Sequence, residues 1–273
     1  MDLSIVIPCY NEIETIPKLQ QELVPVVARM ADQCLAALWP HDETDVHYSR
    51  QAHGKIEVIF VDDGSQDGTF FALLDAFGEQ EIPGVSFQFT QHRENQGLGA
   101  ALRTGFDLAK GIVIVTTDCD GTYRFDEIPK LIARLSPEVD LVTASPYHPA
   151  GAVDGVPPYR LLLSRGSSAI YRMLADRRVY TYTALFRAYR REVIQNVPFQ
   201  ATGFLAGTEL LVNAIRMGYR VAEHPTVLHS RAFGVSKAKI MRTVQAHLGF
   251  QVNTLLPWHP YGFVVRGTMK PPI

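Results

Sequence analysis

The chain has 273 residues, and its 26 Lys and Arg residues against 28 Asp and Glu residues give a net charge of −2. This length fits one large domain, or a domain with a small appendage. Hydrophobic residues make up 47% and charged residues 20% of the chain, which disfavours intrinsic disorder. Because basic residues are not in excess overall, we expect no nucleic-acid partner.

The cysteines and the first residues indicate the compartment. Cys9, Cys34 and Cys119 are widely spaced and form no CxxC pair, which argues against a disulfide framework or a structural zinc site and favours a reducing compartment. The segment MDLSIVIPCYNE has no cationic stretch and reaches Pro8 after a short apolar run. It therefore predicts neither a signal peptide nor a membrane span.

The first half of the chain alternates between strand and helix patterns. Short apolar runs predict strands at 3–8, 56–61, 85–90 and 112–116, and apolar residues at helical spacing predict helices at 13–30, around 71–77 and at 97–110. Residues 32–55 lack this periodicity and form a predicted polar insertion. Such an alternation is typical of an α/β fold with a mostly parallel, Rossmann-like sheet and helices on both faces, in which ligands bind at the carboxyl ends of the strands.

The second half of the chain is less regular. We expect a strand at 140–144, a Pro- and Gly-containing loop at 145–158, a helix at 159–174, a β-prone stretch at 180–189 and a helix around 210–215. Residues 236–256 have a basic start and an apolar helical pattern that polar residues interrupt, so this segment is not predicted to span a bilayer. We expect this segment either to lie at a membrane interface or to pack on the core of the domain. We therefore divide the chain into a catalytic domain, 1–235, and a C-terminal helix and tail, 236–273.

Three polar loops follow predicted strands. SIVIPCYNE ends in Tyr10, Asn11 and Glu12, and IFVDDGSQDGT contains the adjacent carboxylates Asp62 and Asp63. In VTTDCDG, Asp118 and Asp120 are two residues apart, so that in an extended segment both project to one side and can bind a divalent cation. Each loop alone is also compatible with a simple polar turn.

Taken together and in this order, the three loops resemble the family-two glycosyltransferases, which have the glycosyltransferase A fold. NQGLGAALRTGF at 95–106, SRG at 164–166 and LHSRAFGVSK at 228–237 are similar to the polyprenyl-phosphate branch of that family, typified by dolichol-phosphate mannosyltransferase. The resemblance covers approximately residues 3–240.

The resemblance implies a set of site residues, with Mg²⁺ or Mn²⁺ as cofactor. It implies nucleotide-sugar binding by Pro8, Tyr10, Glu12, Val61, Asp62 or Asp63, Asp118, Cys119, Asp120, Arg231 and Lys237; metal binding by Asp118, Asp120 and Thr122; and catalytic roles for Asp118, Asp120, Arg165 and Arg231. Two positions depart from the branch. Thr122 stands where a metal-binding Gln is usual, and Pro146 precedes Tyr147 where an Arg is common.

The expected reaction is a metal-dependent, inverting transfer of a hexose from a nucleoside diphosphate sugar, of the GDP-mannose or UDP-glucose type, to a polyprenyl or dolichyl phosphate. The expected location is cytoplasmic, peripherally associated with the cytoplasmic face of a membrane. One alternative is transfer to a hydroxyl acceptor with Glu209 as base, and another is a non-catalytic nucleotide-sugar-binding module. Because no Asp follows Glu209, we favour an indirect role for Glu209. Arg160 is interpreted as a solvated surface charge.

Overall fold

The computed structural model describes residues 1–32, 55–230 and 240–255. Their main feature is a seven-stranded sheet of order β3-β2-β1-β4-β7-β5-β8. Its strands are β1 (Leu3–Cys9), β2 (Ile56–Asp62), β3 (Val85–Gln91), β4 (Val113–Thr116), β5 (Leu141–Ser145), β7 (Arg187–Arg190) and β8 (Val221–Pro225). β7 pairs antiparallel with β4 and β5, whereas the other pairings are parallel. The predicted mostly parallel sheet is confirmed.

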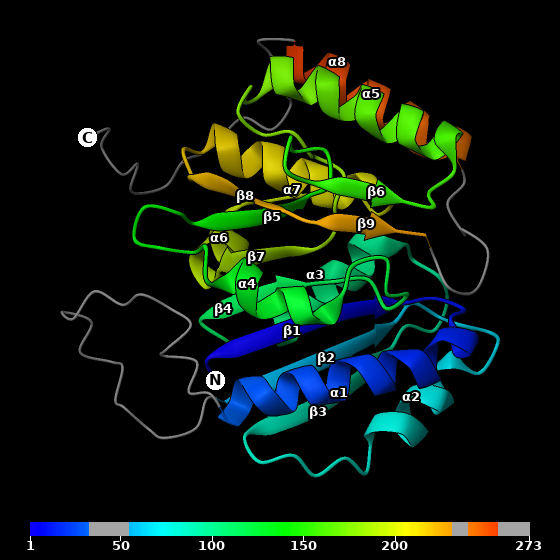
Figure 1. Ribbon diagram of the computed structural model, residues 1–273. Helices are drawn as coiled ribbons and strands as arrows, with labels where there is room; N and C mark the ends of the chain where they lie inside the picture. Colours follow the sequence, from blue (N-terminus) through cyan, green and yellow to red (C-terminus); the bar gives the residue numbers. More distant parts are fainter. Residues whose placement is uncertain (33–54, 231–239, 256–273) are drawn as a thin grey trace.

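Helices cover both faces of this sheet (Figure 1). On one face lie α1 (Ile16–Asp32), which follows a 3₁₀ turn (Ile13–Thr15), together with α2 (Thr69–Phe77) and α4 (Ile128–Ile132), which follows a second 3₁₀ turn (Phe125–Glu127). On the other face lie α3 (Leu98–Leu108), α6 (Arg191–Asn196) and α7 (Leu205–Arg216). Each face has its own apolar core, which explains why every residue of β1 and of β2 is buried.

Three expectations for the second half are corrected. The loop predicted at 145–158 contains a short strand, β6 (Ala152–Asp154), which pairs with β9 (Val227–His229). The β-prone stretch 180–189 forms strand only from Arg187 onward, and β8 was not predicted. Within β7, Arg187 is completely buried. It donates hydrogen bonds to the carbonyl oxygens of Tyr182 and Gly207 and to Thr143 Oγ1, which compensate the cost of burying the charge.

The helices α5 (Pro158–Leu174) and α8 (Ile240–Leu255) lie side by side at one end of the molecule (Figure 1). α8 is not detached from the domain: Phe250 belongs to the core beneath α7, and the Arg216 guanidinium donates a hydrogen bond of 2.7 Å to the carbonyl oxygen of Thr254. The predicted boundary at 235/236 and most of the predicted insertion 32–55 lie outside the described residues. Among the described helices, none is both long enough and apolar enough to cross a membrane.

Candidate active site

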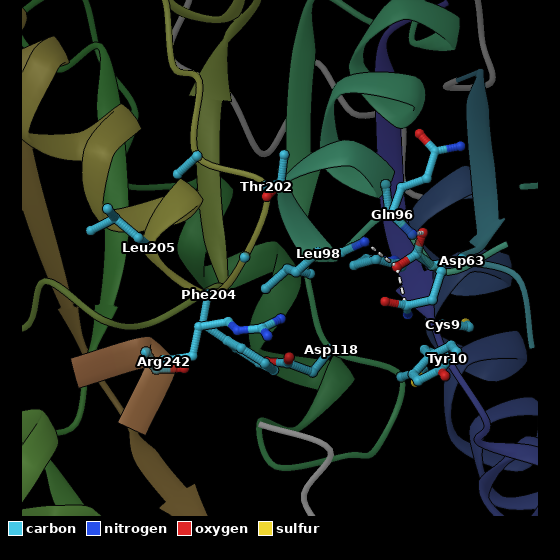
Figure 2. A pocket seen from close by; sticks show the side chains of 18 of the residues that line it. Cys9, Tyr10, Asp63, Gln96, Leu98, Asp118, Thr202, Phe204, Leu205 and Arg242 are labelled. Carbon is cyan, nitrogen blue, oxygen red and sulfur yellow. Dashed lines mark hydrogen bonds between the residues drawn. The ribbon is translucent and has the colours of Figure 1, made fainter. Parts of the chain in front are cut away.

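The first cavity lies where β1, β2 and β4 end and has a volume of about 620 Å³. The end of β1 contributes Pro8 and Cys9 to its lining, and the loops after the three strands contribute Tyr10, Glu12, Asp63, Asp118, Cys119 and Asp120. The opposite wall comes from residues 95–98 before and at the start of α3, from residues 201–205 before and at the start of α7, and from the start of α8 (Figure 2). The structure therefore brings together residues from all three predicted loops, as expected for carboxyl ends of neighbouring parallel strands.

The loop after β1 is held in place by the loop after β2. Asn11 has a φ of 52°, in the left-handed region that Asn tolerates better than most residues. Its backbone N–H donates to Ser65 Oγ at 2.8 Å, and its side-chain oxygen accepts from the backbone N–H of Gln66 at 2.9 Å. These two hydrogen bonds orient the turn that presents Tyr10 and Glu12 to the cavity.

Asp62 is the last residue of β2 and Asp63 follows it, and the structure gives these adjacent carboxylates different surroundings. Asp62 lies outside the lining and binds Ser65 and the Gln91 side chain, so it has a structural role. Val61 is buried in β2 and does not line the cavity either. Asp63 lines the cavity and also accepts hydrogen bonds from His92 at 2.7 Å and from two backbone N–H groups, those of residues 96 and 97, at 2.9 and 2.7 Å. Asp63 therefore fixes the wall in front of α3.

The DCD segment directly follows β4 and lies in the cavity. Asp118 is half-buried and Asp120 is 3% exposed. Asp120 Oδ1 accepts a hydrogen bond of 3.0 Å from the backbone N–H of Thr122, which folds the segment into a tight turn. Between the two carboxylates, contact with the Cys9 thiol and burial raise the pKa of the Cys119 thiol well above its usual value.

These residues fit a divalent cation by their chemistry. Two hard carboxylate oxygens from Asp118 and Asp120 lie at one edge of the cavity, and Thr122 supplies a hydroxyl on the same turn. Among the described residues, no group of three or more His, Cys, Asp or Glu side chains is arranged to hold a metal. Because Mg²⁺ in proteins commonly binds one or two carboxylates, waters and substrate phosphates, a two-carboxylate site is sufficient.

The wall formed by residues 95–98 and 201–205 is held by very close backbone packing. The backbone N–H of Gly99 donates to the carbonyl oxygen of Thr202 at 2.7 Å. Behind this wall, Glu209 is 4% exposed, and its Oε2 accepts hydrogen bonds from the backbone N–H groups of Gln200 and Ala201 at 3.1 and 2.7 Å. Glu209 does not line the cavity, which agrees with the indirect role favoured from the sequence.

A second cavity of about 780 Å³ opens between α5, α8 and the loop after β5. Its lining is mainly apolar, with Tyr123, Tyr147, Leu161, Leu163, Ile170, Val244 and Leu248 among its residues. Hydroxyl groups form a polar strip within it: Tyr147 Oη donates to Ser164 Oγ at 2.8 Å, and Ser164 Oγ lies 2.6 Å from Thr183 Oγ1. Burial is the main reason why the pKa of Tyr123 lies well above its usual value, and Asp118 adds to the effect.

The two cavities meet at the DCD segment. Leu98, Asp118, Asp120, Phe204 and Thr243 line both of them. The first cavity, which has several charged side chains in its lining, and the more apolar second cavity thus share the two carboxylates that are best suited to a metal ion. This arrangement allows a reaction between one molecule in each cavity.

The predicted basic residues lie in different places. Arg165 is exposed, stacks over the Tyr147 ring at 5.2 Å from its centre, and is not among the residues that line either cavity. Arg160, interpreted from the sequence as a solvated surface charge, is instead half-buried and lines the second cavity. Its charge is therefore partly shielded and lies at the wall of a cavity, which the helical spacing alone did not indicate. Arg231 and Lys237 lie outside the described residues.

Sequence reasoning missed two parts of the site. It assigned no role to residues 201–205, whose sequence ATGFL carries no charged group. It treated Arg242 as part of the basic start of an apolar helix and as an interruption of its apolar run. Both line the first cavity. The signal available for the first part was Gly203 with its neighbours before a helix, which is too common a pattern to indicate a site.

Comparisons with known proteins agree with this geometry. Residues 4–197 match the family described as Glycosyl transferase family 2. A polyprenol monophosphomannose synthase from Mycolicibacterium smegmatis is 32% identical over 240 residues, covering 85% of this chain and 79% of that protein. A dolichol-phosphate mannosyltransferase from Pyrococcus furiosus is 28% identical over 241 residues, covering 88% of this chain but only 60% of that protein.

Solved structures show the same fold. A glucosyl-3-phosphoglycerate synthase from Mycobacterium tuberculosis, crystallised with Mn²⁺, UDP and glucosyl-3-phosphoglycerate, superposes with a TM-score of 0.61 over 93% of this chain and 78% of that one, at 19% identity. The same synthase with Mg²⁺ and UDP gives a TM-score of 0.62 at 20% identity, over 92% of this chain and 79% of that one. The match over residues 4–197, together with the 32% identical relative, shows that the chain belongs to glycosyl transferase family 2 and is a glycosyltransferase of the glycosyltransferase A fold.

Proposed function

We propose that the chain catalyses a metal-dependent, inverting transfer of a hexose from a nucleoside diphosphate sugar to a polyprenyl phosphate. The observation that carries this proposal is the junction of the two cavities at Asp118 and Asp120. The first cavity is lined by polar groups suited to a nucleotide, whereas the second has the apolar walls that a lipid chain requires. A donor sugar at the junction would face the head of a lipid in the second cavity.

The names of the relatives support this acceptor class. Two of them are a polyprenol monophosphomannose synthase and an undecaprenyl-phosphate mannosyltransferase, the latter from Micrococcus luteus and 27% identical over 87% of each chain. Because these names refer to mannose, we favour a mannosyl donor of the GDP-mannose type over UDP-glucose. The structural neighbours that bind UDP share only 19–20% identity with this chain, and they support the fold alone.

In such a transfer, negative charge develops on the departing diphosphate while the sugar becomes oxocarbenium-like. Asp118 and Asp120 would hold Mg²⁺ or Mn²⁺, which as a Lewis acid stabilises the charge on the leaving group by several kcal/mol. The polyprenyl phosphate is already an anion at pH 7, so it requires cationic positioning rather than a base. In the described part of the second cavity, Arg160 can supply this positive charge, and the neutral hydroxyl of Ser164 can add a hydrogen bond.

The effect of replacing Glu209 distinguishes a polyprenyl phosphate acceptor from a hydroxyl acceptor. Glu209→Gln should retain a substantial fraction of activity, because the amide oxygen can still accept the hydrogen bonds from the backbone of residues 200 and 201. The measurement is the rate of transfer to polyprenyl phosphate between pH 5 and 9. A loss of several orders of magnitude, with disappearance of the acidic limb of the pH profile, would instead identify Glu209 as the base of a hydroxyl-acceptor enzyme.

The proposed reaction is tested by incubating the protein with Mn²⁺, labelled GDP-mannose or UDP-glucose, and either a short polyprenyl phosphate in detergent or an oligosaccharide mixture. We expect label in the lipid fraction only when a nucleotide sugar and the polyprenyl phosphate are both present. Transfer to the oligosaccharides alone would favour the hydroxyl-acceptor alternative. Nucleotide-sugar binding without any turnover would favour the non-catalytic module.

A polyprenyl phosphate acceptor also implies contact with a membrane surface. α5 and α8 carry exposed apolar side chains that do not line either cavity, among them Met173 at 68% and Met241 at 72% exposure. The basic side chain of Arg165 on α5, which is exposed and lines neither cavity, accompanies them. We infer that this end of the molecule lies on the bilayer interface, with the opening of the second cavity close to the lipid.

The membrane contact predicts a specific effect of charge. The double variant Met173→Glu and Met241→Glu should float with anionic vesicles at least tenfold less than the wild type in a low-salt gradient, since two carboxylates would have to enter the interface. Phe71→Glu is the matched control, because Phe71 is also 72% exposed but lies on α2, which covers the opposite side of the sheet. Equal flotation of all three proteins, or none for the wild type, would contradict the proposed surface.

A further inference from the structure

The first cavity contains more acidic than basic groups. Glu12, Asp63, Asp118 and Asp120 all line it. In the part of the chain that the structure describes, the lining contains a single cationic side chain, Arg242. The negative charge of these carboxylates opposes the binding of another anion, since like charges at close range repel strongly away from bulk water.

A nucleoside diphosphate is itself strongly anionic. A bound divalent cation compensates only part of the summed charge of the carboxylates and the diphosphate. A cationic side chain that reaches the phosphates would therefore strengthen binding. A guanidinium is well suited, because its planar arrangement of N–H donors can bind two phosphate oxygens at once.

The position of Arg242 meets this requirement. It lies in the first turn of α8, and its guanidinium points into the cavity on the side of Asp118 (Figure 2). Thr243 and Ala246 on the same helix also line the first cavity. Val244 and His247, in contrast, line the second. α8 is therefore a wall common to both cavities.

We propose that Arg242 binds the diphosphate of the nucleotide sugar and thereby fixes α8 between the donor and the acceptor. This inference rests on the proposed function, because it assumes a nucleoside diphosphate in the first cavity. It assigns to α8 a role in donor binding in addition to its apolar contacts. Loss of the guanidinium should weaken diphosphate binding and leave the contacts of the nucleoside unchanged.

The test is calorimetric titration of the full chain with GDP and UDP, and with GMP and UMP, in Mg²⁺. For whichever diphosphate the wild type binds, Arg242→Gln should weaken binding about 10- to 100-fold, the range expected for a charge-assisted hydrogen bond. Binding of the matching monophosphate should change less than threefold. Arg242→Lys should recover part of the loss. Arg177→Gln is the control, since it removes the same charge from an exposed residue that lines neither cavity.

The different failures are distinguishable. If the wild type binds GDP or UDP and Arg242→Gln binds it equally well, the role of Arg242 is wrong while the proposed function stands. An equal loss for diphosphate and monophosphate would also overturn it, because it would indicate a general disturbance of the cavity. If the wild type binds neither diphosphate, the proposed function and the inference about Arg242 both fail. Arg242 is exposed, so its variants are expected to keep the wild-type melting temperature.

Discussion

Asp118→Asn and Asp120→Asn are each expected to lower the rate of sugar transfer about a thousandfold. Both carboxylates lie at the junction of the two cavities, and in the proposed reaction they would hold the metal ion that stabilises the charge of the departing diphosphate. Losing about 4 kcal/mol of charge stabilisation in the transition state corresponds to this factor. The fold should persist, because an amide retains the shape of the carboxylate that it replaces. In the Asp120→Asn variant, the amide oxygen can still accept the hydrogen bond from the backbone N–H of Thr122.

The measurement is the single-turnover rate with saturating nucleotide sugar and polyprenyl phosphate. Asp75→Asn is the control for the change of charge, since Asp75 is exposed on α2 and lines neither cavity. Treating the wild type with a chelator should reproduce the loss, and added Mn²⁺ should reverse it. Near-wild-type turnover of either variant in the presence of the chelator would show that these carboxylates do not hold a catalytic metal ion.

Gly99→Ala is expected to reduce both stability and activity. A Cβ atom at position 99 would overlap with the carbonyl oxygen of Ala201 and would approach the Cβ of Ala206 to 2.8 Å. These atoms belong to the backbone and to a short side chain, so they cannot rotate away. Overpacking of this kind costs about 1–3 kcal/mol. The relief is a shift of residues 201–205 away from α3, which changes the wall of the first cavity.

We expect the melting temperature of Gly99→Ala to fall by about 3–10 °C, as 1 kcal/mol corresponds to about 2–4 °C in a chain of this size. Transfer should fall about a hundredfold, the effect that a displacement of about 1 Å has on a positioned reaction. Gly203→Ala is the stability control, because a Cβ there would meet no atom within 4 Å. If Gly99→Ala melts like Gly203→Ala, the close packing between α3 and residues 201–205 is not a constraint.

Several site residues were predictable because they directly follow strands. β1, β2 and β4 are apolar runs that end in polar loops, and parallel pairing brings their carboxyl ends to one edge. Tyr10, Asp63 and Asp118 therefore lie together in the first cavity. The sequence did not indicate which of Asp62 and Asp63 lines the cavity. That depends on the direction in which each side chain projects at the end of β2.

The residues that escaped prediction lie on elements brought in from distant parts of the chain. Arg242 and Arg160 are on helices. The spacing of apolar residues predicts an apolar stripe on each helix, but it does not indicate which neighbouring element the stripe packs against. Only the packing of α8 against α5 and α7 directs Arg242 into the first cavity, and only the start of α5 directs Arg160 into the second.

The sequence by itself determined the α/β class, the positions of the first four strands along the chain, and the three polar loops. These features depend on local periodicity and on breaks between neighbouring elements. The tertiary structure decided the antiparallel position of β7, the burial of Arg187, and the junction of the two cavities at Asp118 and Asp120. These features depend on contacts between residues that are far apart in the chain. Local periodicity does not record such contacts, since a buried arginine and an exposed one have the same place in the pattern.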